Sequence, residues 1–240
     1  KATSNICTAQ VLLAVIASMY AVYHGPEGLA AIAHDVHTRS KVLVAGLNKL
    51  GFTIKNKNYF DTITIDVGAQ RDAIIARAAA EKINFCILGA SQLSISLDEA
   101  TTPEIIEAVW RAFGGALKFA DFANDVSVIP ANLIRKGACL KHPIFSRYRS
   151  ETELLRYLRK LADRDLALDR AMIPLGSCTM KLNATAEMIP VTWPEFGALH
   201  PFAPADQAKG YYELFDDLKN WLVEITGYDA VSLQPNSGAQ

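Results

Sequence analysis

The sequence lacks an excess of charge of either sign, and it lacks an apolar run long enough to cross a membrane. Its 240 residues contain 24 Lys and Arg against 25 Asp and Glu, for a formal charge of -1. No basic stripe interleaved with aromatic residues runs along it, so a nucleic-acid partner is not expected. The longest apolar stretch, residues 11–23, is well short of the roughly twenty residues that span a bilayer. We therefore expect a globular protein with no membrane partner, in which residues 11–23 form a core helix.

Patterns for metal binding and disulfides are also missing. The four cysteines are scattered and show no C-x-x-C spacing: Cys7, Cys86, Cys139 and Cys178. The five histidines do not cluster with them at metal-ligand spacing, so reduced thiols and no metal site are expected. His34 and His37 lie one turn apart, but the intervening Asp35 favours a solvated helix face. Asp98 and Glu99 similarly favour a solvated turn over a catalytic carboxylate pair.

Helical periodicity is present over the first fifty residues. Apolar side chains recur at helical spacing over residues 11–22, and Ser4 or Asn5 is available as the N-cap. Gly25-Pro26 ends this helix because proline cannot continue the hydrogen-bond ladder. The same period resumes over residues 29–50. Two helices separated by a Gly-Pro break are therefore expected.

A two-residue alternation follows, typical of half-buried strands. Strands are predicted around residues 52–54, 62–67, 83–88 and 93–97. The alanine-rich residues 70–82 predict a helix between them. Thr102 followed by Pro103 predicts the start of another helix, which continues to Phe113. This order describes a small mixed α+β layer, so we expect the α/β fold class.

The remaining chain is expected to leave this layer. Residues 117–150 have no sustained period, and residues 151–162 predict a charged amphipathic helix. Residues 163–200, with prolines near their end, predict an extended arm over another surface. Residues 206–227 predict a helix, and residues 228–233 predict a short strand. The helix is expected to bury one apolar face: Tyr211, Leu214, Leu218, Trp221, Leu222 and Ile225.

The densest chemistry lies in residues 176–183, which hold two hydroxyls, a thiol, an amine and an amide. These residues predict an ordered loop that places functional groups, and the alternative is a polar connector whose Ser and Thr bond their own backbone. Lys181 is a candidate Schiff-base amine, but its apolar neighbours on a loop favour a surface charge or an anion contact. Cys178 is a candidate nucleophile, but the absence of histidine from the loop favours a small neutral side chain.

A second candidate loop follows the strand predicted at residues 228–233. In residues 236–239 (NSGA), glycine removes a side-chain obstacle and leaves backbone N–H groups free to cradle a phosphate. The alternative is an ordinary Ser-Gly turn.

Six stretches carry a family resemblance. They are residues 1–8 (KATSNICT), 59–62 (YFDT), 142–148 (HPIFSRY), 173–183 (IPLGSCTMKLN), 188–196 (MIPVTWPEF) and 233–240 (LQPNSGAQ). Together they closely resemble the glycine cleavage system P-protein family, and the resemblance covers the whole chain. It implies a pyridoxal 5'-phosphate enzyme built from two homologous halves of the fold-type I transferase kind. The start at Lys1 and the end in a glycine loop lead us to expect an internal piece of such a protein.

The resemblance implies an oxidoreductase that decarboxylates glycine and transfers the aminomethyl group to the lipoyl arm of H-protein, alongside T-protein and L-protein. It implies a phosphate-binding loop for the cofactor and a segment near the active-site entrance. The loop residues are Ser237, Gly238 and Ala239, and the entrance residues are Ser177, Cys178, Thr179 and Lys181. The cofactor lysine of the family lies beyond Gln240. The chain alone is therefore expected to be inactive and not to bind pyridoxal 5'-phosphate tightly.

The resemblance also implies a domain organisation. Residues 1–145 would end the first half with its small domain, residues 146–205 would be a linker helix and arm, and residues 206–240 would begin the large domain of the second half. It implies a homodimer or a two-half assembly, cytoplasmic in a bacterium and mitochondrial in a eukaryote. The alternative function is a non-catalytic scaffold that docks the two halves. A different fold-type I enzyme, such as a group II amino-acid decarboxylase, is less favoured by the octapeptide at residues 176–183.

Overall fold

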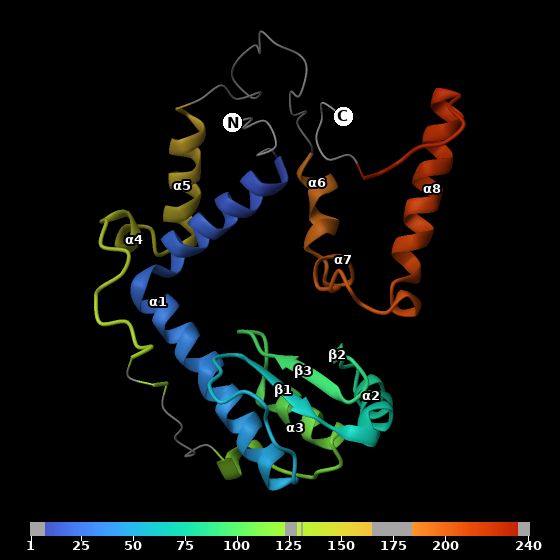
Figure 1. The fold of residues 1–240 in the computed structure, drawn as a ribbon. Helices are drawn as coiled ribbons and strands as arrows, with labels where there is room; N and C mark the ends of the chain where they lie inside the picture. The colour runs from blue at the N-terminus through green and yellow to red at the C-terminus, as the bar shows by residue number, and fades with distance from the viewer. Residues whose placement is uncertain (1–7, 123–128, 131, 165–183, 235–240) are drawn as a thin grey trace, which may run out of the picture. The chain divides into compact units, whose positions relative to one another are not determined.

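A computed structural model describes residues 8–122, 129, 130, 132–164 and 184–234 (Figure 1). The chain divides into two compact units. One is Tyr20–Arg149, and the other combines Lys1–Met19 with Ser150–Gln240. The two units are described separately below.

A long kinked helix, α1 (Thr8–Lys49), begins the described chain. Gly25 interrupts its helical backbone with φ 58° and ψ -173°, directly before Pro26. Glycine tolerates this positive φ, and the proline lacks the N–H that would continue the ladder. The two predicted helices and the break between them are thus confirmed, and α1 is the label for both together. The predicted caps, Ser4 and Asn5, lie outside the described residues.

A three-stranded antiparallel sheet follows, with β1 (Thr62–Asp66), β2 (Cys86–Leu88) and β3 (Gln92–Ser96) in the order β1-β3-β2. Ile65 and Ile87 both pair with Leu93, from either side of the central strand. The predicted strands at 62–67, 83–88 and 93–97 are confirmed with shorter bounds. The strand predicted at 52–54 is wrong, because the only pairing recorded there is a single bridge from Ile54 to Ile65.

Two helices pack with α1 against this sheet: α2 (Arg71–Ala80), preceded by a 3-10 turn at Gly68–Gln70, and α3 (Pro103–Ala112). Thr102 caps α3 by accepting a hydrogen bond from the Ile105 N–H, as its sequence predicts. Fully buried side chains from the sheet and all three helices form one core: Leu43, Leu47, Ile63, Ile65, Ile74, Leu93, Ile106 and Trp110. Burial of each such large side chain contributes about 1.5–3 kcal/mol.

His37 belongs to this unit and corrects one expectation. His34 is exposed, but His37 is buried, with its ring stacked on Phe60 at 5.3 Å between centroids. Its Nδ1 lies 2.9 Å from the Phe60 carbonyl oxygen. The solvated-face interpretation is therefore wrong for His37, because the loop before β1 folds over that side of α1.

Short helical elements end the first unit and begin the second. A 3-10 turn (Phe119–Phe122) and α4 (Ile144–Arg147) lie in the segment predicted to be irregular, and α5 spans Glu151–Ala162 as predicted. Ser150 caps α5 by accepting a hydrogen bond from the Glu153 N–H at 3.3 Å.

The predicted extended arm is wrong over residues 184–200. These residues form α6 (Thr185–Met188), a 3-10 turn (Ile189–Thr192) and α7 (Pro194–Gly197), and a further 3-10 turn spans Ala205–Gln207. Pro190 and Pro194 occupy first-turn positions, where the fixed φ of proline favours helix and its missing N–H costs nothing. Residues 165–183 of the predicted arm lie outside the described residues.

The last helix, α8 (Lys209–Thr226), is confirmed as a helix, but none of its residues is buried. Its predicted inner face is thus wrong within the described residues. The strand predicted at 228–233 is also wrong, because no described strand pairs with it.

The helix predicted at residues 11–23 is likewise not a core helix along its first turns. Five of its large apolar side chains are exposed: Val11, Leu12, Leu13, Val15 and Ile16. Among the described residues, no helix has the length and apolar character needed to cross a membrane.

Candidate functional site

Every residue to which the sequence assigns a site role lies outside the described part of the chain. These residues are Ser177, Cys178, Thr179, Lys181, Ser237, Gly238 and Ala239. The described residues nearest in sequence to Ser237, Gly238 and Ala239 are α8 and residues 227–234, so the candidate site is built from them.

The chain turns back sharply after α8. Gly227 adopts a left-handed conformation (φ 71°) and donates its N–H to the Val223 carbonyl at 2.8 Å. This is the conformation that glycine allows at a helix C-terminus. The Thr226 hydroxyl donates to the Leu222 carbonyl at 2.6 Å, one turn back along the helix. The turn returns residues 231–234 alongside α8.

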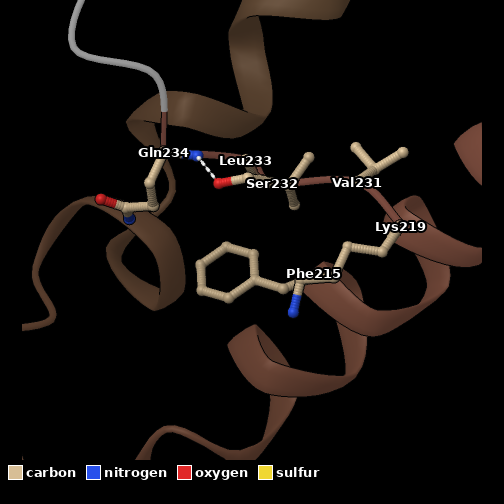
Figure 2. A pocket seen from close by; sticks show the side chains of 6 residues that line it. All are labelled: Phe215, Lys219, Val231, Ser232, Leu233 and Gln234. Carbon is tan, nitrogen blue, oxygen red and sulfur yellow. Dashed lines mark hydrogen bonds between the residues drawn. The ribbon is translucent and has the colours of Figure 1, made fainter. Parts of the chain in front are cut away.

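Residues 231–234 and α8 enclose a pocket of about 380 Å³ (Figure 2). Phe215 and Lys219, one turn apart on α8, form one wall. Residues 231–234 form the other wall, and the Ser232 hydroxyl oxygen accepts a hydrogen bond from the Gln234 N–H at 3.3 Å. In the sequence, Gln234 lies two residues before the predicted phosphate-binding loop.

The charge of the pocket is already paired. The Lys219 ammonium lies 3.2 Å from the Asp216 carboxylate, and both side chains are largely exposed. A phosphate site needs several free N–H donors, as at a helix N-terminus or a glycine-rich loop. Among the described residues the pocket offers one paired ammonium, one hydroxyl and the Gln234 side-chain amide, and neither a glycine nor a helix N-terminus lines it. The described residues therefore do not by themselves fit pyridoxal 5'-phosphate.

A second junction brings one of the sequence stretches that carry the family resemblance, residues 142–148, against α1. Gly25 sits at the α1 kink, where an added Cβ would overlap the Phe145 carbonyl oxygen of α4. Arg149 donates a hydrogen bond from its guanidinium to the His24 carbonyl. Glycine at position 25 thus permits the close approach of the 142–148 stretch to α1.

A polar cluster that the sequence did not predict lies on the same unit. The Tyr20 hydroxyl donates to a Glu99 carboxylate oxygen at 2.8 Å, and this hydrogen bond raises the pKa of Tyr20. The Arg39 guanidinium donates to the Thr101 carbonyl at 2.6 Å, which ties the 98–101 turn to α1. The Asp98 carboxylate accepts the Ala100 N–H at 3.0 Å. The turn at Asp98 and Glu99 is confirmed, but Glu99 is engaged by a residue 79 positions away, which no local signal could reveal.

The described residues hold no group of His, Cys, Asp and Glu side chains that could bind a metal ion. Cys86 and Cys139 are free thiols, whereas Cys7 and Cys178 lie outside the described residues. Together, the elements define a mixed α/β protein, with a small antiparallel sheet packed against helices and a separate helical unit that carries the pocket.

Comparison with known proteins specifies the class further. Residues 1–113 match the family model "Glycine cleavage system P-protein". The whole chain is 67% identical over 241 residues to a protein of Bradyrhizobium diazoefficiens named glycine dehydrogenase (decarboxylating). It is 68% identical over 245 residues to the protein of that name from Rhodopseudomonas palustris, and 62% identical over 240 residues to that from Allorhizobium ampelinum. The chain belongs to the glycine cleavage system P-protein family. It spans 25% of the length of each of these three relatives.

Proposed function

We propose that this chain is part of a decarboxylating glycine dehydrogenase. The protein would release carbon dioxide from glycine and pass the remaining aminomethyl group to the lipoyl disulfide of H-protein. One sulfur of the disulfide takes the aminomethyl carbon and the other is reduced to a thiol. The observation that carries this proposal is the 67% identity, along the whole chain, to a relative with that name.

The family implies pyridoxal 5'-phosphate, which supplies an electron sink for the loss of carbon dioxide. We assign its phosphate to Ser237, Gly238 and Ala239, because the resemblance places this loop there. The entrance role of Ser177, Cys178, Thr179 and Lys181 stays a proposal on the same resemblance. The expectation that this chain alone does not bind the cofactor tightly stays a proposal, because the resemblance places the cofactor lysine beyond Gln240.

The proposed organisation is a small domain of a fold-type I transferase up to residue 145, a linker over 146–205, and the start of a second large domain from 206. The division of the chain after Arg149 supports the first boundary. H-protein, T-protein and L-protein are the proposed system members, in a homodimer or two-half assembly. The relatives named above come from bacteria, which supports the cytoplasmic alternative.

A docking role is the second candidate, and one observation favours it. Large apolar side chains between α6 and the turn before α8 are exposed: Met188, Ile189, Val191, Trp193, Phe196 and Phe202. Contiguous exposed apolar surface marks a site of interaction. This segment is thus a candidate surface for joining the two halves.

The two functions are separated by substituting Ser177 and Lys181 in the full-length protein. Glycine–bicarbonate exchange measures catalysis, and the mass in solution measures assembly. Lost exchange with intact assembly supports the catalytic assignment, whereas lost assembly supports the docking role. Unchanged exchange and assembly refute both assignments for these residues. Lys160→Ala is a matched control because that lysine is exposed on α5 and does not line the pocket.

A further inference from the structure

A stripe of large apolar side chains runs along α8, and the described residues of its own unit leave it exposed. Its members, which we call the α8 stripe, are Leu214, Leu218, Trp221 and Ile225. Their exposed fractions run from 38% for Leu218 to 79% for Ile225. Four such side chains on one helix face form more than the scattered exposure that surfaces ordinarily show.

The spacing of the α8 stripe is that of a helix-packing seam. Successive members are separated by four, three and four residues, which is the alternation of a and d positions in a heptad. Side chains at this spacing insert between those of a second helix that crosses at a shallow angle. The next apolar residues around the helix, Phe215 and Leu222, lie to one side of the stripe, and Phe215 already lines the pocket (Figure 2). The geometry therefore selects a helix as the partner of the stripe.

Charged residues on the other side of the stripe indicate the charge of the partner helix. Asp217 and Glu224 lie one heptad apart along this flank, and no described basic side chain forms an ion pair with either. The nearby Lys219 pairs with Asp216, on the far side of the helix. A second α8 packed antiparallel would set these two acids against their own copies, and such like-charge contacts are unfavourable. A partner helix with Lys or Arg along this flank would satisfy them.

The length of the relatives indicates where this partner lies. The chain spans 25% of their length, so most of a family member lies outside these residues. We propose that the α8 stripe seats an amphipathic helix from the remainder of the same polypeptide, with leucine-type side chains at heptad spacing and Lys or Arg facing Asp217 and Glu224. This inference rests on family membership and not on the proposed reaction.

The test is site-specific photo-crosslinking in the full-length protein. Trp221 is replaced by p-benzoylphenylalanine, an aromatic residue that keeps a large ring in the stripe. Asn220 is replaced in the same way as the control, since its side chain leaves α8 on the far side from the stripe. We expect a crosslink within one polypeptide from position 221, mapped by mass spectrometry to a helix outside these 240 residues, and no such crosslink from position 220.

A charge reversal tests whether Lys or Arg of the partner helix faces Asp217 and Glu224. Asp217→Lys is expected to reduce the yield of the crosslink from position 221, whereas Asp216→Lys, the same change on the opposite face, is expected to leave it unchanged. A crosslink to a second copy, to H-protein or to a strand would overturn the proposal, and so would the absence of any crosslink. Equal yields with the two lysine variants would overturn the assignment of a basic partner. Because exchange activity is not the readout, these outcomes are independent of the proposed reaction.

Discussion

Gly46 lies in the interior of α1 against the indole ring of Trp110, which is fully buried. A Cβ at position 46 would lie 2.5 Å from Trp110 Cζ2, closer than the 3.0 Å that real Cβ contacts respect. The ring is also held in place, because its Nε1–H donates a hydrogen bond to the Leu43 carbonyl at 3.1 Å. Gly46→Ala must therefore displace a ring that is both packed and bonded.

Two opposing effects set the size of this change. Alanine in place of glycine stabilises a helix interior by about 1 kcal/mol. Overpacking a core costs about 1–3 kcal/mol, and a buried hydrogen bond that loses its partner costs about 1–3 kcal/mol more. The two costs together exceed the gain in helix propensity, so the free energy of unfolding is expected to fall by about 1–5 kcal/mol.

Urea unfolding followed by far-UV circular dichroism measures this change. Gly210→Ala in α8 is the control, because nothing lies within 4 Å of its added Cβ. A double-mutant cycle combines Gly46→Ala with Trp110→Phe. In the background of the smaller phenylalanine ring, Gly46→Ala is expected to lower the free energy of unfolding by less than it does in the parent. The reasoning is refuted if Gly46→Ala unfolds at the same urea concentration as the parent or at a higher one.

Three further predictions concern the same unit. Gly25→Ala is expected to lower the free energy of unfolding by more than about 1 kcal/mol, because the φ of Gly25 is 58° and an added Cβ would overlap the Phe145 carbonyl oxygen. An unchanged melting temperature would contradict this expectation. Lys82 has a φ of 61°, so Lys82→Gly is expected to raise the free energy of unfolding by up to about 1 kcal/mol, and a lower melting temperature would show that the side chain is needed. The Arg111 guanidinium, 2.8 Å from both carboxylate oxygens of Glu81, lowers the pKa of that carboxyl. A carboxyl whose pKa is lowered on folding stabilises the folded state at neutral pH, and this stabilisation is lost as the pH falls through the lowered pKa. The urea midpoints of the parent and Glu81→Gln are therefore expected to differ at neutral pH and to converge in acid. Midpoints that stay apart in acid would show that the difference is not electrostatic.

Local signals account for the elements that the sequence predicted well. The Thr102-Pro103 start of α3, the break at Gly25-Pro26 and the alternation in β1 each depend on neighbours a few residues apart. The burial of His37 under Phe60 and the bond from Tyr20 to Glu99 depend on residues 23 and 79 positions apart, so no local pattern contains them.

The wrong predictions have the same origin. Residues 228–233 have a strand-like sequence, but a strand is defined by the partner that accepts its hydrogen bonds, and no described residue provides one. Pro190 and Pro194 favour an extended arm when the sequence is taken alone, yet the same fixed φ also suits the first turn of a helix. The assigned site residues lie outside the described ranges, so their roles depend on the family resemblance alone.

By itself the sequence determined the family, the helix starts and breaks, and the strand periodicity, because these are written in residue identity and short-range spacing. Only the tertiary structure decided which faces are covered: it buries His37, sets Trp110 against Gly46 and leaves the α8 stripe exposed. The physical reason is that burial depends on what packs against a side chain, and that neighbour is often distant in the sequence.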